Sequence, residues 1–411
     1  MARVTRDPET LANPRLWIAF ASMFLVSGIT NVFPVFFPAL LAEFGGSRGA
    51  TAFTVSLCWI GGAVFGPLAG YLVARGNPRA VVAAGLSAAA LGMVAGALAP
   101  SLPAFILTLG VGAGIGIGLT GIATQAALLA DVYVRRRGLA MGIAFSGSMA
   151  GYAVAPLVHW TIEQAGWRAA LAAYGVTVAA LLPLAWRFLP ARLESARALA
   201  TSPAAEGHPT VRRIVTSAPF LMLFVCFTSP PLFGYLATTQ HALYFAARGF
   251  SAEEASLMLA VGGVLSAGGR MLSGVVADRL GAPTAGFLSF GLSLTGMLCL
   301  FGLELWPLRL LAYTYVLFLF LPLGSRATIV SVLVSRLTPP RHYGVIFGIL
   351  GIGNNLGAAA GPWMSGALFD RTGSYLVIYL WGAGVGLLGL VTLAAFVLMT
   401  REAATAGPRV R

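Results

Sequence analysis

Long apolar segments separated by short polar ones fill most of the chain. They lie at about residues 15–41, 50–74, 80–99, 103–130, 138–160 and 168–189, and then at about 219–246, 254–277, 283–303, 309–335, 344–367 and 374–399. An α-helix that spans a bilayer needs roughly 20 mostly apolar residues. The pattern therefore predicts an all-α polytopic protein with twelve transmembrane helices in a lipid bilayer.

The longest polar segment divides these helices into two groups of six. Residues 190–218 are rich in charged side chains and contain Pro203 and Pro209, a composition typical of a linker. We therefore expect an N-terminal six-helix bundle over 1–189, a cytoplasmic linker over 190–218 and a C-terminal six-helix bundle over 219–411.

The composition narrows the class of function. Apolar residues make up 58% of the chain and charged residues 9%, against about 45–50% and about 25% in soluble domains. This excludes a soluble enzyme, a disordered chain and a nucleic-acid-binding domain. The three cysteines lie in apolar runs without metal-ligand spacing, and no Walker motif occurs. We expect no catalytic residue, no cofactor and no metal site.

Basic residues predict how the helices are oriented. All 26 cations are arginine. With the N-terminus inside, 19 arginines fall in inside segments and five in outside segments, namely Arg48, Arg168, Arg248, Arg309 and Arg371. By the positive-inside rule, both termini and the linker are cytoplasmic. The remaining two, Arg270 and Arg326, fall inside apolar runs.

The two halves of the chain repeat each other. The segment from Gly70 to Arg75 matches the segment from Gly274 to Arg279 at an offset of 204, and the glycines and proline of the fifth run recur in the eleventh at an offset of 206. This indicates a duplicated six-helix unit, an arrangement that many transporters use for alternating access.

These motifs resemble the major facilitator superfamily. The segment Gly274-Val-Val-Ala-Asp278-Arg279-Leu-Gly281 is similar to its signature G-x-x-x-D-R-x-G. The resemblance implies a fold of two pseudo-symmetric six-helix bundles and a cytoplasmic gating motif, here Asp278, Arg279 and Arg75. In the N-terminal copy of the signature, Ala74 stands where the acid is expected.

A narrower resemblance links the chain to monocarboxylate transporters and oxalate:formate antiporters. It rests on residues 131–148 and 361–375, and on the spacing of His241, Arg270 and Arg279. It implies that Arg270 pairs with a substrate carboxylate and that His241 lies near the site. Ser266 occupies the place where eukaryotic monocarboxylate carriers often have an aspartate.

The two intramembrane arginines point to an anion even without that resemblance. Arg270 lies 16 residues past the outer start of its run (254) and Arg326 lies 17 past the start of its own (309), so both should lie at nearly the same depth. No acid occupies the middle of any run. A guanidinium suits a carboxylate because it donates two parallel hydrogen bonds. Alternatively, either arginine bonds helix carbonyls or reaches toward the cytoplasm.

Several uncharged polar residues join these arginines as candidates. His241 is a proton carrier, a substrate ligand or a polar residue of the outer gate, and Pro230 and Pro231 could bend its helix. The other candidates for lining a substrate path are Asn31, Thr120, Gln125, Tyr235, Tyr313, Asn354 and Asn355. Each is equally well explained by hydrogen bonding between helices.

Together these observations predict a secondary active transporter that moves a small organic anion, a monocarboxylate, by alternating access. We expect proton symport, with exchange for another anion as the alternative. An efflux carrier for a hydrophobic metabolite or drug and a non-transporting receptor of the same fold are the rival classes. We expect a monomer in a bacterial inner (plasma) membrane, with no nucleic-acid partner.

Overall fold

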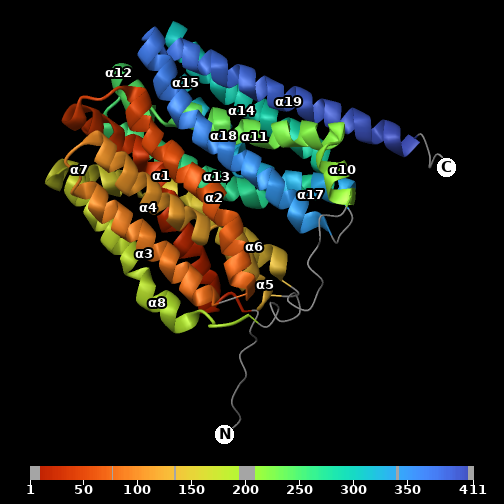
Figure 1. The fold of residues 1–411 in the computed structure, drawn as a ribbon. Coiled ribbons are helices and arrows are strands. Elements are labelled where there is room, and N and C mark those ends of the chain that lie inside the picture. Colours follow the sequence, from red (N-terminus) through yellow and green to blue (C-terminus); the bar gives the residue numbers. More distant parts are fainter. Residues whose placement is uncertain (1–9, 76, 134–135, 194–208, 339–341, 406–411) are drawn as a thin grey trace. The chain divides into compact units, whose positions relative to one another are not determined.

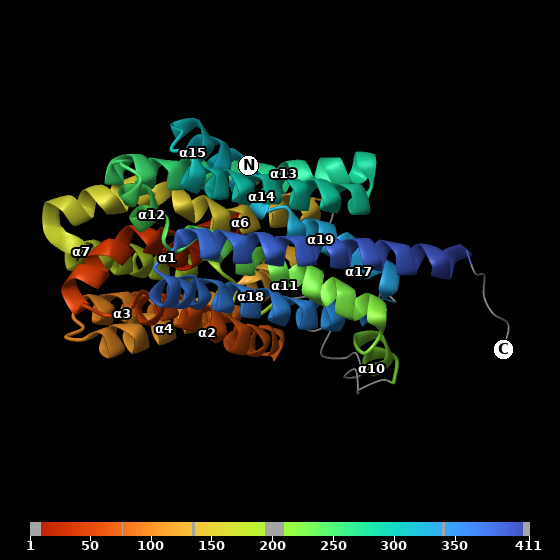
Figure 2. The ribbon, with the colours of Figure 1, turned by 90° about the horizontal axis from the view of Figure 1, so that it is seen from above.

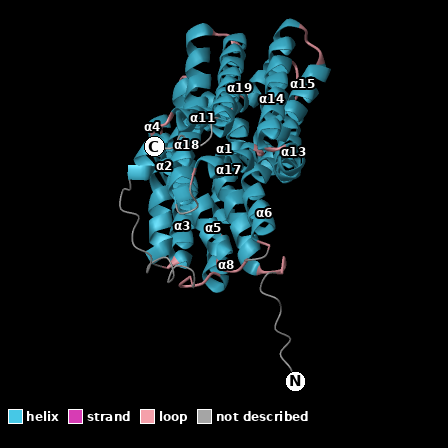
Figure 3. Ribbon diagram, turned by 90° about the vertical axis from the view of Figure 1, so that its right-hand side faces the viewer, coloured by secondary structure: helices cyan, strands magenta, loops and turns pink. Residues whose placement is uncertain are grey.

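The computed structural model describes residues 10–75, 77–133, 136–193, 209–338 and 342–405. Within these ranges every regular element is a helix and none is a strand (Figure 3). Both chain ends and residues 194–208 of the predicted linker lie outside the described residues.

Two compact units make up the described chain (Figure 1). Residues up to 46 and residues 53–193 form the first unit. Its helices are α1 (Pro14–Phe44), α2 (Arg48–Arg75) from residue 53 onward, α3 (Pro78–Ala97), α4 (Leu102–Leu119), α5 (Ile122–Ala130), α6 (Arg137–Ala150), the 3₁₀-helix η1 (Gly151–Val154), α7 (Ala155–Ala179) and α8 (Leu181–Phe188).

Residues 47–52 and 209–405 form the second unit. Its helices are α10 (Pro209–Val215), α11 (Ala218–Thr238), α12 (His241–Ala247), α13 (Ala252–Leu280), α14 (Ala282–Leu305), α15 (Arg309–Tyr315), the π-helix η2 (Val316–Phe320), α16 (Leu321–Leu323), α17 (Arg326–Leu337), α18 (Tyr343–Thr372) and α19 (Tyr375–Thr405). Helix α10 shows that the end of the predicted linker is helical.

The described helices account for the predicted twelve spans. Eleven helical segments are long and apolar enough to cross a membrane, and one of them, Gly138–Phe188, has 51 residues. That length suffices for two crossings. Gly166 interrupts this segment inside α7 with φ 80° and ψ 163°, a conformation that glycine adopts without steric cost. Figure 2 shows the resulting sharp bend in α7. The twelve-helix fold is confirmed.

Small residues let the helices of each unit approach closely. A Cβ atom placed on Gly92 of α3 would lie 2.7 Å from the Cα of Gly112 in α4. Such a distance is too short for any side chain, so the two backbones touch directly. This is the packing expected of membrane helices, where dispersion contacts take over from the hydrophobic effect.

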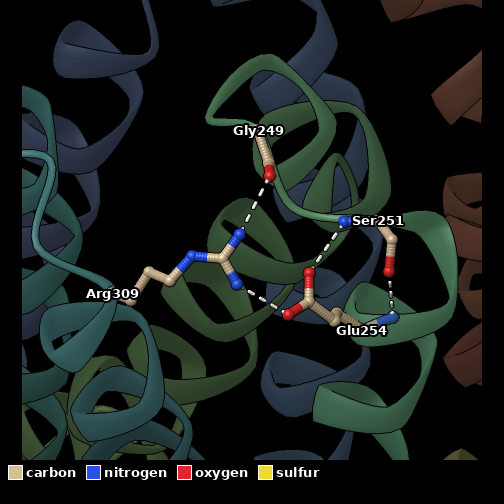
Figure 4. Close-up of polar contacts among 4 residues, drawn as sticks. All are labelled: Gly249, Ser251, Glu254 and Arg309. Carbon is tan, nitrogen blue, oxygen red and sulfur yellow. Dashed lines mark hydrogen bonds and ion pairs between the residues drawn. The ribbon is translucent and has the colours of Figure 1, made fainter.

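Polar contacts connect the start of α13 and the start of α15 in the second unit. Helix α13 begins with a capping box in which Ser251 and Glu254 satisfy each other's backbone N–H groups (Figure 4). Arg309 donates to the Glu254 carboxylate at 2.7 Å and to the Gly249 carbonyl at 3.2 Å. These bonds tie the start of α15 to the loop before α13.

Candidate functional site

The fourth span is interrupted inside the first unit. Helix α4 ends at Leu119 and α5 begins at Ile122. The side chain of Gln125 reaches back across the break, and its Nε2 atom donates to the Thr120 carbonyl at 3.0 Å. Both residues are buried, and the Gln125 Oε1 atom has no partner among the described residues. The break thus exposes a carbonyl that a long polar side chain satisfies.

The tenth span is interrupted inside the second unit. It passes through the π-helix η2 and the three-residue α16 before α17 begins at Arg326. Pro322 lacks an N–H group, so the regular hydrogen-bond ladder cannot continue through it. Two side chains of α13 donate to carbonyls on either side of Pro322. The Ser266 Oγ donates to the Phe320 carbonyl at 2.6 Å, and the Arg270 Nε donates to the Gly324 carbonyl at 3.0 Å.

These two interruptions lie at equivalent places in the sequence repeat. Thr120 and Gly324 are 204 residues apart (324 − 120), the same offset that relates the Gly70–Arg75 and Gly274–Arg279 segments. In each unit, the carbonyl at the break accepts a hydrogen bond from a long polar side chain. Paired breaks in corresponding spans are the feature that best marks a binding region in transporters built from repeats.

Arg270 lies half-buried on α13, beside the break in the tenth span. The carbonyl bond that we considered as an alternative is therefore present, and it uses the Nε atom. Ser273, one turn further along the helix, donates to the carbonyl of Arg270 itself at 2.7 Å. The backbone and the guanidinium of Arg270 are thus both held in place.

Arg326 has different surroundings from Arg270. It is 4% exposed and lies between the rings of Phe233 and Phe290, each 5.0 Å from its Cζ atom. Its Nη2 atom donates to the Ser289 carbonyl at 3.2 Å and to the Ser293 hydroxyl. The Nε and Nη1 atoms have no partner among the described residues. Arg326 therefore lies among α11, α14 and α17.

His241 is buried at the start of α12, after a break in the helix at Thr239 and Gln240. Helix α11 itself continues through Pro230 and Pro231 to Thr238, so the chain is interrupted later than those prolines suggest. The His241 Nε2 atom lies 3.1 Å from the Ala255 carbonyl, and Nδ1 lies 3.4 Å from the Tyr315 hydroxyl. Because a carbonyl only accepts, Nε2 carries a proton, and in the neutral imidazole Nδ1 then accepts from the tyrosine.

The two asparagines with described bonds connect neighbouring helices. Asn31 donates to the Ser148 carbonyl at 2.6 Å, and Asn354 donates to the Phe227 carbonyl at 3.5 Å. Asn355 and Tyr235 are partly buried, and Thr120 donates its hydroxyl to Gly116 in its own helix. Tyr313 is 48% exposed and contacts the ring of Phe250. Within the first unit, the structure thus joins Thr120 to Gln125.

The residues of the predicted gating motif lie at helix ends. Asp278 and Arg279 are exposed in the last turn of α13, just before Gly281, which has φ 84°. Within the described residues, no ion pair includes Asp278. Arg75 ends α2, and its side chain lies outside the described residues.

Sequence reasoning missed the residues that stabilise the interrupted tenth span. Ser266 precedes Arg270 by one helical turn, and Pro322 and Gly324 are helix-breaking residues within an apolar run. The proline and glycine could have revealed the break. The bonds of Ser266 and Ser293 could not have been read from the sequence, because their partners lie on other helices.

Comparison with known proteins agrees with this fold. The family model described as Major Facilitator Superfamily matches residues 18–325. The chain belongs to the major facilitator superfamily. The resemblance inferred from the signature at Gly274–Gly281 is therefore confirmed.

Curated relatives of this superfamily member come from the monocarboxylate transporter branch. Monocarboxylate transporter 13 of Rattus norvegicus is 29% identical over 391 residues, which cover 92% of this chain and 88% of that protein. Monocarboxylate transporter 11 of Mus musculus is 30% identical over 394 residues, which cover 89% and 83%. The narrower resemblance is confirmed as well.

Solved structures share the fold at lower sequence identity. A D-xylose-proton symporter superimposes with a TM-score of 0.75 at 17% identity, covering 93% of this chain and 96% of that chain. A bacterial homologue of the human lysosomal transporter Spinster gives 0.71 at 16% identity, covering 94% and 96%.

Proposed function

We propose that the chain is a secondary active transporter that moves a small organic anion, a monocarboxylate, by alternating access. The curated relatives described above are named monocarboxylate transporters. The superfamily to which the chain belongs consists of transporters rather than enzymes. These names support the class of cargo, and the surroundings of the intramembrane arginines support its charge.

The observation that carries the proposal is the bond between Arg270 and the interrupted tenth span. The Arg270 Nε donates to the Gly324 carbonyl at 3.0 Å, which holds the guanidinium beside the break. A carboxylate that binds end-on takes the two Nη groups of a guanidinium and can leave such an Nε bond in place. Arg270 is therefore the proposed substrate anchor.

Other residues are proposed to complete the path and the gate. The proposed substrate-path residues are His241, Asn31, Thr120, Gln125, Tyr235, Asn354 and Asn355, with Tyr313 in an exposed position, and the proposed gating residues are Asp278, Arg279 and Arg75. Arg326, which the sequence places in the same group, lies in a cradle of its own.

We propose that transport of the anion is coupled to a proton, with anion exchange as the alternative. His241 and Arg270 are the proposed coupling residues. Histidine is the side-chain type whose charge most readily changes near neutral pH when it is exposed to water. In its present state, Nδ1 accepts from Tyr315. A protonated His241 would donate at that nitrogen instead, and the tyrosine hydroxyl can turn to accept. The pair thus has two arrangements that differ by one proton.

Uptake into proteoliposomes tests the cargo. Purified parent protein is compared with Arg270→Ala, Arg270→Lys and Arg371→Gln, using labelled short-chain monocarboxylates with and without a pH gradient. Arg371 is exposed at the end of α18, so Arg371→Gln serves as the matched control. We expect at least about tenfold lower uptake with Arg270→Ala, because a charge-assisted pair is lost, a partial loss with Arg270→Lys and parental uptake with the control.

Three results separate the alternatives. Undiminished anion uptake by Arg270→Ala would reject the proposed anchor and favour an efflux carrier for hydrophobic compounds. Counterflow without any response to the pH gradient would favour an exchanger. Absence of flux for every carboxylate in the parent protein would reject the proposed cargo. We further propose that the protein works as a monomer in a bacterial inner membrane with cytoplasmic termini.

A further inference from the structure

Arg326 carries a charge that the proposed transport reaction does not use. It begins α17 and is 4% exposed. The two benzene rings of Phe233 and Phe290 flank its guanidinium, and Ser289 and Ser293 of α14 accept from its Nη2 atom. We call these five residues the Arg326 cradle. All five belong to the second unit.

Hydrogen-bond donors outnumber acceptors in the Arg326 cradle. A guanidinium has five N–H groups and no acceptor. Both described acceptors lie on Nη2, whereas Nε and Nη1 have no partner among the described residues. Ser293 accepts from Arg326, and its own hydroxyl hydrogen has no acceptor in the described part of the chain. The cradle therefore lacks acceptors on at least two sides of the cation.

Charge is unbalanced in the same place. In the described part of the second unit, the ion pairs join Arg248 with Glu304 and Arg309 with Glu254, and neither includes Arg326. Aromatic faces attract a cation but supply no formal negative charge. A water molecule could accept from the free N–H groups, but it would leave the charge uncompensated. Only an anion would both accept from the free N–H groups and balance the charge of the guanidinium.

We propose that the Arg326 cradle binds a compact monovalent anion of the halide class, held as a resident ion inside the second unit. The guanidinium supplies the charge and the free N–H groups, and Ser293 supplies a hydroxyl donor. The start of α17 adds the favourable potential of a helix N-terminus. This site is separate from the proposed carboxylate anchor at Arg270, whose bond goes to Gly324.

Thermal unfolding of the purified full-length protein tests the resident ion. Sodium chloride and sodium bromide are compared with sodium methanesulfonate, a salt without halide or carboxylate, at equal ionic strength. A ligand that binds only the folded state raises the melting temperature by mass action. We expect a saturable rise with either halide. Arg326→Gln should abolish the halide-dependent rise, and Ser293→Ala should raise the half-saturating halide concentration about fivefold, the effect of one lost hydrogen bond.

Control variants keep the proposal falsifiable. Arg270→Gln should retain the full halide response, so failure of the carboxylate proposal and failure of this one are distinguishable. If Arg326→Gln does not fold, Arg326→Lys and Ser293→Ala take its place. A bromide anomalous-scattering peak in crystals of the parent protein should lie between α11, α14 and α17. Equal melting temperatures in halide and methanesulfonate, or an unchanged halide response in Arg326→Gln, would overturn the proposal.

Acetate distinguishes a resident halide from a cargo carboxylate at the same place. In Arg270→Gln protein, acetate should give no rise in melting temperature while chloride still does. A rise with acetate in Arg270→Gln that disappears when Arg326→Gln is added would assign the Arg326 cradle to the cargo, and the resident-halide proposal would fall.

Discussion

Arg270 and Arg326 are both arginines within apolar helices, yet they meet different surroundings. Arg270 is half-buried and donates to a carbonyl at a break in a neighbouring helix. Arg326 is almost fully buried between two aromatic rings, with part of its guanidinium unsatisfied. Depth in the membrane alone does not decide what a buried charge does. The hydrogen-bond partners of the charged side chain decide its role.

At the same scale, His241→Gln should separate proton coupling from substrate movement. A glutamine amide can still donate to the Ala255 carbonyl and accept from Tyr315, but it does not titrate. We expect carboxylate counterflow to continue while accumulation driven by a pH gradient is lost. Both are measured in proteoliposomes. Parental accumulation by His241→Gln under the gradient would exclude His241 as the proton carrier.

The interrupted helices are the features that matter at the scale of elements. A regular transmembrane helix satisfies its own carbonyls, whereas two carbonyls at the break in the tenth span accept hydrogen bonds from side chains of α13. Ser266 and Arg270 lie one turn apart on α13 and serve Phe320 and Gly324. The position of Arg270 and the shape of the break therefore depend on each other.

Removing the Ser266 hydroxyl should weaken this arrangement. Ser266→Ala removes the hydrogen bond to the Phe320 carbonyl, which should cost about 0.5–1.5 kcal/mol of stability and raise the KM for the anion. Ser273→Ala is the matched control, because Ser273 donates only within its own helix, to Arg270. Melting temperature and uptake kinetics are the measurements. Equal effects of the two substitutions would show that the bond across the helices contributes nothing.

A second prediction at the scale of elements concerns the close contact between α3 and α4 in the first unit. Gly92→Ala would push a Cβ to 2.7 Å from the Gly112 Cα and 2.8 Å from the Thr108 carbonyl. We expect it to destabilise the protein by about 1–3 kcal/mol through overpacking. Gly142→Ala is the control, since nothing lies within 4 Å of its added Cβ. A thermal scan in which both variants melt with the parent would argue against tight α3–α4 packing.

For the whole molecule, hydropathy and internal repetition were enough to predict twelve helices in two similar halves. Hydropathy and repetition are properties of long segments, so they remain recognisable where single residues depart from the pattern. The hydrogen-bond partners of polar side chains could not be predicted from the sequence, because residues such as Ser266 and Phe320, which share a hydrogen bond, are 54 positions apart in the chain. From the sequence, Pro230 and Pro231 could bend the seventh span; the helix continues through both prolines and ends at Thr238. A membrane helix can continue through a proline when neighbouring groups bond to the backbone carbonyls that the proline leaves without a donor.

Membrane orientation is the remaining property of the whole chain, and cysteine labelling can test it. The native cysteines, Cys58, Cys226 and Cys299, are buried, so an introduced thiol can be followed against a low background. Leu98 is 77% exposed between α3 and α4, on the side that the arginine distribution makes external. Arg192 is exposed after α8, on the side predicted to be cytoplasmic.

We expect a membrane-impermeant maleimide to label Leu98→Cys in intact cells and Arg192→Cys only after permeabilisation. The excess of arginine in the inside segments, 19 against five, is the physical reason, because positively charged loops resist translocation. The parent protein, labelled under both conditions, gives the background of the buried thiols. The opposite labelling pattern would invert the whole topology. The direction of proton-driven flux assigned to His241 and Arg270 would then have to be reversed with it.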